Sequence, residues 1–271
     1  MKKRGKAMAK ELTKNDVIIH KKQAIKKINN LLEMYINNPN EKFLKKANLL
    51  SYWLENFSDY IKEETNFNPQ ELISYNRGDV IKLNFGFNVG SEHGGLHYAI
   101  VLDNNNLHSS PVVTVIPLSS GTEDSTYKRD VFLGQELYNK LNAKNTSFFN
   151  NEAQRLNENK EKLDALKKQL QEVQKIGTDN DTIISIRNMI SFLKEQIQEI
   201  NTDIEILKKY SKEISHMKQG SIAMMEQITT VSKMRLYVPK KSTDILYGIS
   251  FSPETMEKIN TQLIKLYLKS K

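Results

Sequence analysis

The chain has no cysteine, a single tryptophan and no long apolar run. The lack of cysteine excludes a disulfide framework, a thiolate nucleophile and a cysteine-based zinc site, and it fits the reducing cytoplasm in which we expect the protein to act. No apolar run approaches the roughly 18 residues that a membrane-spanning helix needs. The basic start, Met1–Lys10, is not followed by the apolar segment of a secretory signal. We therefore expect no membrane partner.

Positive charge is concentrated at one end of the chain. Residues 1–30 carry ten Lys or Arg and two Asp or Glu, whereas the remainder carries 30 of each sign, so the net charge of +8 comes from the N-terminal part. We interpret residues 1–20 as a basic arm. Such an arm is either a solvated tail or a source of salt-sensitive, sequence-independent attraction to nucleic acid.

With 271 residues, 38% of them hydrophobic, the chain can form one sizeable domain or two small ones. Residues 21–74 have a helical pattern, because apolar residues recur at three- and four-residue steps. Pro39 and the pair Asn68-Pro69 interrupt this pattern, which predicts two or three helices. The apolar positions are Ile25, Ile28, Leu31, Leu32, Tyr35, Ile36, Phe43, Leu49, Leu50, Trp53, Leu54, Phe57, Tyr60 and Ile61.

The apolar period changes to two after Asn76, which is typical of strands. Short strand-like runs separated by turn-rich stretches occupy residues 75–134 and resume in 218–271, and they predict a small, strongly curved antiparallel sheet or barrel. Ser252-Pro253-Glu254 has the features of a helix start, so we expect a final helix that covers the barrel. The strand-like runs are Asp79–Phe85, Ala99–Leu102, Val112–Leu118, Val131–Leu133, Gly220–Glu226 and Arg235–Val238.

Residues 135–217 separate the two halves of the strand pattern. Apolar residues from Ile186 to Leu207 follow steps of 4, 3, 4, 3, 4 and 3, which is a heptad repeat. A similar seam runs from Leu156 to Val173. We predict an inserted antiparallel coiled-coil hairpin, too polar and regular to be an active site, that serves as a partner-binding arm, a dimerisation arm or a tolerated insertion.

The loop between the first two strands is the strongest indication of a functional site. It reads Asn88-Val89-Gly90-Ser91-Glu92-His93-Gly94-Gly95-Leu96-His97-Tyr98, whereas a plain hairpin needs only a short turn. This stretch resembles the G-S-E-Q-G-G-x-R-P loop of the PemK/MazF-type toxins. Three further segments resemble the same family, and they occur in the family's order. They are Arg77–Val80, Ser110–Ser119 and Met225–Leu236. At the last of these, family members read L-[ED]-Q-I-R-T-[IV]-D-K-x-R-L.

The resemblance implies an α+β fold: an SH3-like small β-barrel with a C-terminal helix, interrupted by the hairpin and preceded by the N-terminal helices. It also implies a toxin that cuts single-stranded RNA without metal or other cofactor. In that reaction the ribose 2′-hydroxyl attacks the adjacent phosphate and leaves a cyclic phosphate and a 5′-hydroxyl. The implied partners are RNA, an antitoxin protein and a second copy of the chain, since the family forms homodimers.

Two positions that carry chemistry in the family are occupied by other residues here. The Arg of G-G-x-R-P is His97, and the Thr at the end of the third strand is Ser119. Serine keeps a hydroxyl donor, whereas histidine loses a permanent phosphate-binding cation and gains a group that titrates near neutrality. The Arg of Q-I-R-T is also replaced, by Thr229. We expect His97 to act as general acid or base and Ser119 to bind phosphate.

The alternative is that the replacements mark a degenerate site in a non-catalytic RNA- or protein-binding module. A third interpretation, from related toxin folds, is a poison of a DNA-acting enzyme. His20, His108 and His216 show no spacing with Asp or Glu that indicates a metal site.

Further site residues are assigned from the same resemblance. Glu92 is expected to orient His97 or to brace the loop by accepting backbone N–H groups, and we favour bracing. Glu226 matches an acid that takes part in catalysis in another branch of the family. The expected RNA-binding residues are Ser91, His93, Gly94, Gly95, Tyr98, Gln227, Lys128 and Arg129. Among them, the two glycines would let RNA approach closely, Tyr98 would stack on a base or lie in the core, and the two cations would replace the missing arginine charge.

Overall fold

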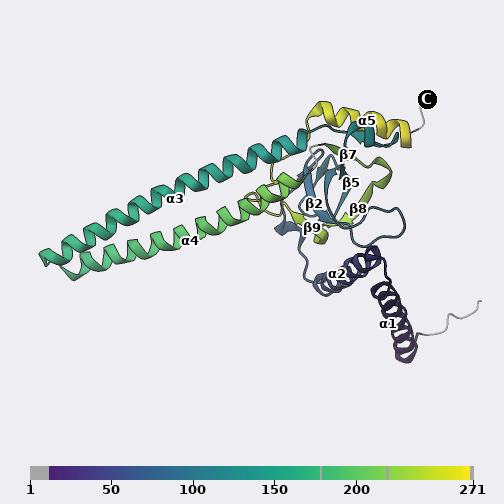
Figure 1. The fold of residues 1–271 in the computed structure, drawn as a ribbon, viewed down its shortest axis with the longest axis horizontal. Helices are drawn as coiled ribbons and strands as arrows, with labels where there is room; N and C mark the ends of the chain where they lie inside the picture. Colours follow the sequence, from purple (N-terminus) through teal and green to yellow (C-terminus); the bar gives the residue numbers. More distant parts are fainter. Residues whose placement is uncertain (1–11, 178, 218–219, 269–271) are drawn as a thin grey trace, which may run out of the picture. The chain divides into compact units, whose positions relative to one another are not determined.

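The computed structural model describes residues 12–177, 179–217 and 220–268. Helices and antiparallel strands are both present, which confirms the prediction of a mixed helix and sheet fold (Figure 1). None of the helices in these ranges combines the length and apolarity that a membrane span requires. The chain divides after Asn66 into two compact units.

The first unit is a pair of helices, α1 (Lys14–Ile36) and α2 (Glu41–Glu63). Helix α1 starts at a capping box in which Thr13 and Asp16 each accept from the other's backbone N–H. The predicted basic arm therefore runs into this helix, and its first eleven residues lie outside the described part. Only Ala47 and Leu50 are buried among the described residues of this unit, so most of its apolar face is exposed.

The second unit is built on a seven-stranded antiparallel sheet. Its strands are β2 (Val80–Asn84), β3 (Leu96–Val101), β5 (Val112–Ser120), β6 (Val131–Phe132), β7 (Ser221–Ala223), β8 (Thr229–Ser232) and β9 (Leu236–Val238). The strand order is β6-β7-β5-β3-β2-β9, and β8 also pairs with β5. Strands β1 (Tyr75–Asn76) and β4 (Asn105–Asn106) form a separate pair.

This sheet is not the closed barrel that we expected. Strands β6 and β9 end the strand order, and in the described ranges no ladder joins them. The long strand β5 divides its pairing, since its first half pairs with β8 and its last three residues pair with β7. Met225–Gln227, at the end of an expected strand, forms a 3₁₀ turn instead. The Met225 N–H there donates to the Asp130 carboxylate at 3.0 Å rather than to a neighbouring strand.

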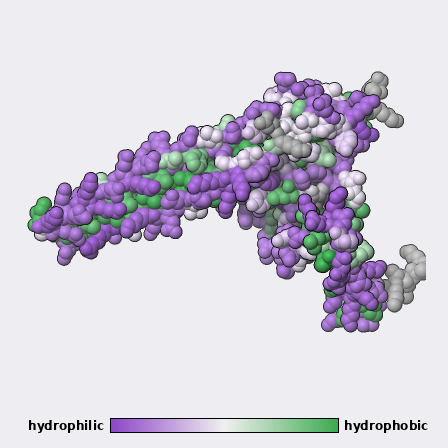
Figure 2. Space-filling view, viewed as in Figure 1, coloured by the Kyte–Doolittle hydropathy of each residue, from purple (hydrophilic) through white to green (hydrophobic). Residues whose placement is uncertain are grey.

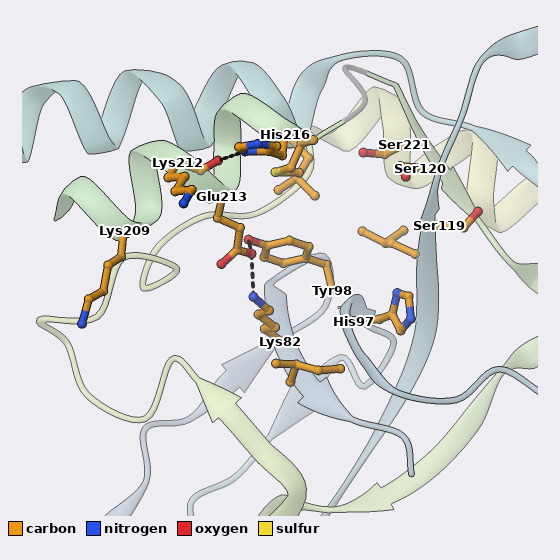
Figure 3. Close-up of a pocket in the computed structure, with 14 residues that line it drawn as sticks. Lys82, His97, Tyr98, Ser119, Ser120, Lys209, Lys212, Glu213, His216 and Ser221 are labelled. Carbon is orange, nitrogen blue, oxygen red and sulfur yellow. Dashed lines mark hydrogen bonds and ion pairs between the residues drawn. The ribbon is translucent and has the colours of Figure 1, made fainter. Parts of the chain in front are cut away.

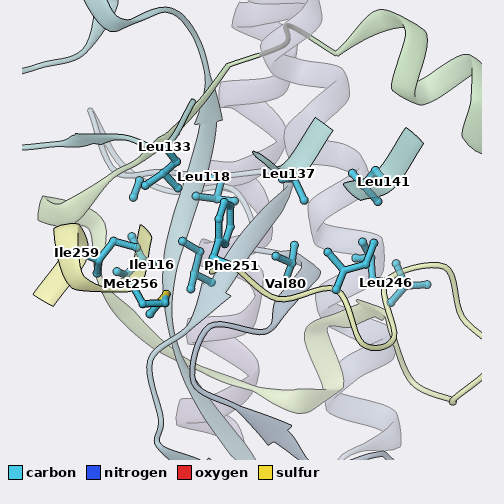
Figure 4. Close-up of a cluster of buried hydrophobic side chains, with 14 of the residues drawn as sticks. Val80, Ile116, Leu118, Leu133, Leu137, Leu141, Leu246, Phe251, Met256 and Ile259 are labelled. Carbon is cyan, nitrogen blue, oxygen red and sulfur yellow. The ribbon is translucent and has the colours of Figure 1, made fainter. Parts of the chain in front are cut away.

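Apolar side chains pack on both faces of the sheet. Along β2, Val80 belongs to one buried cluster while Ile81 and Leu83 belong to the other, in line with the two-residue alternation of strand side chains. Helix α5 (Pro253–Tyr267) packs on the Val80 cluster through Met256 (Figure 4). As predicted, Ser252 caps this helix, and its hydroxyl accepts from the Thr255 N–H.

Residues between β6 and β7 form a helical hairpin of α3 (Glu136–Ile176) and α4 (Asn180–His216). Gly177 ends α3 in a left-handed conformation with φ of +75°, which favours glycine. The two helices run side by side, and apolar surface lies along them between hydrophilic outer faces (Figures 1 and 2). The seam far from the sheet consists of Leu163, Leu166, Leu170, Val173, Ile186, Ile190, Leu193 and Ile197.

The base of this hairpin belongs to the core of the sheet unit. Leu137 and Leu141 of α3 are buried in the same cluster as the sheet residues Val80 and Ile116 (Figure 4). Leu207 and Ile214 of α4 belong to this cluster too. Only the distal part of the hairpin packs solely on itself. The base of the hairpin therefore contributes to the core of the sheet unit.

Candidate functional site

The loop between β2 and β3 is closed by its own backbone. The Gly86 carbonyl accepts from the Gly95 N–H at 2.7 Å, and the Gly95 carbonyl accepts from the Phe85 N–H at 2.8 Å. A Cβ atom on Gly94 would lie 2.7 Å from the Gly86 carbonyl oxygen, and Gly95 has a φ of +89°. Loop geometry alone therefore requires both glycines, independently of any approach by RNA.

Two polar side chains brace this loop from within. Asn88 donates from Nδ2 to the His93 carbonyl at 2.7 Å, and Glu92 accepts at Oε2 from the Val89 N–H at 3.1 Å. Each bond fixes a backbone group that would otherwise have only water as a partner. Glu92 thus has the bracing contact that we favoured for it.

Gln227, which follows β7 in the 3₁₀ turn, clamps the loop from the other side. Its Oε1 accepts from the His93 N–H at 3.1 Å, and its Nε2 donates to the Ser91 carbonyl at 3.3 Å. Predicted residues from two distant blocks of the sequence are therefore brought together. The amide of Gln227 is already engaged in holding the loop.

The loop brings together two imidazole rings that are tilted against each other. The ring centroids of His93 and His97 lie 4.2 Å apart, and the edge of the His93 ring packs against Phe85. His97 is the second residue of β3 and lies opposite Leu83 of β2. Its ring also forms a hydrogen bond with the Gly94 backbone. The glycine loop thus sets the position of the predicted catalytic histidine.

Burial keeps both imidazoles in the neutral form. For His93, burial and then the neighbouring His97 lower the pKa from 6.5 to about 4. Burial also lowers the pKa of His97, and the nearby Lys82 adds to this, while the bond to Gly94 opposes it. A neutral imidazole at pH 7 can accept a proton as a general base, whereas a general acid would have to be the protonated imidazolium.

The half-buried His93 should make the fold sensitive to acid. Its folded pKa lies below the unfolded value, so the unfolded chain binds the proton first and stability falls as pH drops from about 6.5 to about 4. His93→Gln should remove on the order of 2 kcal/mol of the free energy of unfolding that is lost between these pH values. This is less than the full pKa shift of His93 would give, because the ring is half-buried and solvent screens part of the effect. Urea unfolding at pH 7 and pH 4 measures it. His20→Gln, which replaces an exposed histidine, is the control, and equal pH dependence of wild type and His93→Gln would contradict the prediction.

A cavity of about 680 Å³ lies where β3 and β5 separate, beside the base of α4 (Figure 3). The last ladder pair of these strands is Ala99 with Pro117. His97 lies two residues from Ala99 along β3, and Ser119 lies two residues from Pro117 along β5, where β5 has changed its partner to β7. The cavity is lined by Lys82, Leu96, His97, Tyr98, Leu118, Ser119, Ser120, Leu137, Lys209, Lys212, Glu213, His216, Met217 and Ser221.

A charged network that the sequence did not reveal crosses this cavity. Glu213 of α4 accepts at Oε1 from Lys82 Nζ at 2.5 Å and from the Tyr98 hydroxyl at 2.6 Å (Figure 3). Burial alone would raise the pKa of the Glu213 carboxyl, but the two donors outweigh it and hold that pKa below its usual range. The Tyr98 ring packs on the core and under Lys82, so its hydroxyl and one ring face are engaged.

The other predicted residues lie around a second hollow of about 460 Å³. Glu92, His93, Glu226 and Gln227 line it together with Arg235. The two neighbouring histidines connect the two sites, because His93 lines this hollow while His97 lines the larger cavity. The structure therefore divides the predicted site instead of gathering it in one place.

Lys128 and Arg129, the two cations expected to replace the missing arginine charge, are exposed and lie just before β6. Arg129 Nε forms an ion pair with Glu226 Oε1 at 2.7 Å, so each neutralises the other. Lys128 is exposed, and its carbonyl accepts from Gln262 of α5. Neither cation lines the cavity that holds His97. Within the described ranges, no group of three or more His, Cys, Asp or Glu side chains is placed to hold a metal ion.

Residues missed by the sequence analysis come mainly from α4. Lys209, Lys212, Glu213 and His216 line the cavity of His97, although the hairpin looked too regular to form part of a site. Nothing in their spacing distinguishes them from other polar residues on the outer face of a heptad helix. Lys82 likewise looks like an ordinary polar residue of an alternating strand.

Comparison with curated proteins found no match to the chain. A family model does match, over a segment that includes β2 to β6 and helix α3. It contains the loop of His97 and the block Ser110–Ser119, whereas the block Met225–Leu236 lies outside it. Residues 76–176 match the family described as PemK-like, MazF-like toxin of type II toxin-antitoxin system, which confirms the resemblance inferred from the sequence.

Proposed function

We propose that this protein is a toxin-like endoribonuclease that cuts single-stranded RNA without a metal ion, with His97 as general base. The observation that carries the proposal is the position of His97 within the matched segment. His97 is hydrogen-bonded to the Gly94 backbone and lines a cavity that Ser119 also lines. The lowered pKa of His97 favours the base over the acid among the two roles expected from the sequence.

The proposed reaction moves one proton to His97 and exchanges one bond at phosphorus. The neutral His97 ring takes the proton of a ribose 2′-hydroxyl, and the freed oxygen forms a bond to the adjacent phosphorus. The bond from phosphorus to the 5′-oxygen breaks, and that oxygen takes a proton from solvent. The products are a cyclic phosphate and a 5′-hydroxyl end. Ser119, which lines the same cavity, donates its hydroxyl to a phosphate oxygen as charge develops.

The other site residues support this chemistry indirectly. Glu92 and Gln227 hold the loop that carries His97, and Glu226 holds Arg129 at the rim of the second hollow. We propose that RNA bases pass along this hollow, where Glu92 and His93 line its loop side and Ser91 precedes them in the loop. As in the matched family, an antitoxin protein and a second copy of the chain are the proposed partners.

The proposal is tested with purified protein and a long, mostly unpaired RNA in the presence of EDTA, followed by mapping of the end groups. The expected result is a set of discrete cuts with cyclic-phosphate and 5′-hydroxyl ends. RNA that stays intact in EDTA, with or without later addition of Mg²⁺, would reject the proposal. Cuts that leave 5′-phosphates would reject the 2′-hydroxyl mechanism.

The second candidate is a non-catalytic module that binds RNA or protein. The replacement of a permanent cation by His97 favours it, because a neutral imidazole does not bind phosphate at pH 7 as an arginine does. Saturable binding of RNA that remains uncut would support this candidate.

A further inference from the structure

Three lysines line the cavity of His97, and they differ in what already holds them. Lys82 is buried, with its side chain only 11% exposed, and forms the ion pair with Glu213 at 2.5 Å. Lys209 and Lys212 are exposed on α4. Within the described ranges neither of these two forms a salt bridge, whereas their neighbour Lys208 pairs with Glu205. The uncompensated positive charge of the cavity therefore comes from α4.

The spacing of these residues puts them on one face of the helix. Lys209, Lys212, Glu213 and His216 occupy positions i, i+3, i+4 and i+7, so their side chains emerge on the same side of α4. Glu213, in the middle of the row, is fixed to Lys82 and Tyr98 of the sheet (Figure 3). The row is thereby aligned with the cavity.

The helix that carries the row is rigidly attached. Leu207 and Ile214 flank the lysines in sequence and are buried in the sheet's core, 7% and 3% exposed. Asn145 of α3 also donates to the Ser211 hydroxyl of α4 at 2.6 Å. The two lysine side chains thus extend from a fixed backbone, one helical turn apart, with about 4.5 Å of rise between them.

We propose that Lys209 and Lys212 bind backbone phosphates of single-stranded RNA next to the scissile linkage, so that the hairpin forms one wall of the site. This inference rests on the proposed function and names the residues that hold its substrate. It accounts for the loss of the loop arginine: the charge that His97 lacks comes from α4. The ligand that fits is a polyanion. Among the described residues with which α4 lines the cavity, Glu213 is paired with Lys82, so the charges without an ion-pair partner are the flexible ammonium groups of Lys209 and Lys212.

The test measures binding to a single-stranded 2′-O-methyl oligonucleotide, which has no free 2′-hydroxyl and cannot be cut by the proposed step. Lys209→Gln/Lys212→Gln in the full chain is compared with Lys194→Gln/Lys208→Gln, which removes the same charge from the same helix outside the cavity lining. Affinity is measured from 50 to 300 mM salt. Thermal unfolding of each variant checks that the fold is unchanged.

The variant Lys209→Gln/Lys212→Gln should bind the oligonucleotide more weakly than the control variant. The plot of log affinity against log salt should also be less steep, by about 1.4 in the magnitude of its slope, or about 0.7 for each phosphate that is no longer bound. Equal slopes for the two double variants would overturn the inference, as would a wild type that does not bind the oligonucleotide. Cleavage of unmodified RNA by the wild type is measured in parallel. Salt-dependent binding through α4 without any cleavage would reject the proposed nuclease but keep the phosphate contacts.

Discussion

Replacing His97 by alanine is expected to lower RNA cleavage by about 10²-fold or more at pH 7, with little change in RNA binding. Removal of a general base takes away the proton acceptor for the 2′-hydroxyl, and such groups typically contribute 10²- to 10⁴-fold. Binding should persist because the neutral imidazole contributes no charge to phosphate. Single-turnover rates with saturating protein separate the chemical step from binding.

The pH profile of wild-type cleavage gives a second readout. A base must be deprotonated to work, and the pKa of His97 lies below its usual range, so activity should persist below pH 6.5 and fall only at more acidic pH. This acidic limb should be absent from the residual activity of His97→Ala. His20→Ala, at an exposed position of the first unit, is the control. An unchanged rate in His97→Ala would remove this residue from the mechanism.

Features that depend on local sequence were predicted well. The alternation from Ile81 to Phe85 places β2, and Ser252-Pro253-Glu254 places the start of α5, because strand faces and helix caps are set by neighbouring residues. The long loop before His97 was also recognised from its glycines. Its order, however, comes from Gly86 meeting Gly95 and from Gln227, about 130 residues away, and only the folded chain shows these contacts.

Features that depend on how distant segments meet were not predicted. A sheet closes into a barrel only if the number of strands, their tilt and their register are mutually consistent. The two-residue alternation of apolar side chains along each strand shows none of these three properties. Here β5 changes partner from β8 to β7 along its length, and the sheet stays open. The same holds for the site, where Glu213 reaches Tyr98 across 115 positions of the sequence.

The hairpin illustrates both cases. Its heptad repeat predicts two helices that pack together, and they do so along the distal seam. Periodicity alone does not show where that seam passes into the core of another element. Leu207 and Ile214 occupy ordinary apolar positions of a helix, yet both lie in the core of the sheet unit. The base of the hairpin and the sheet therefore share one core, which the heptad repeat alone does not indicate.

Shortening the hairpin at two lengths should give opposite results. Asn159 and Gln196 lie side by side, since their amides are hydrogen-bonded, so a short Gly/Ser turn can replace residues 160–195. This removes the distal seam except for Ile197 and leaves the base of the hairpin in place, so the sheet unit should still unfold cooperatively. Replacing residues 150–216 in the same way also removes Leu207, Ile214 and Glu213, and no stable fold is expected.

The size of the second effect follows from the side chains that the longer deletion removes. Each large core side chain is worth about 2–5 kcal/mol, and Lys82 would be left buried without its partner at a cost of about 3–5 kcal/mol. Together these losses approach or exceed the roughly 5–15 kcal/mol that holds a typical domain. Far-UV circular dichroism during urea unfolding is a suitable measure, because the single tryptophan, Trp53, lies in the first unit and reports on that unit.

Two point variants separate core packing from the effect of a large deletion. Leu207→Ala should lower the free energy of unfolding by about 2–5 kcal/mol, whereas Ile184→Ala, at a site 51% exposed near the tip of the hairpin, should change it by less than about 0.5 kcal/mol. A folded protein lacking residues 150–216 would show that the hairpin is dispensable.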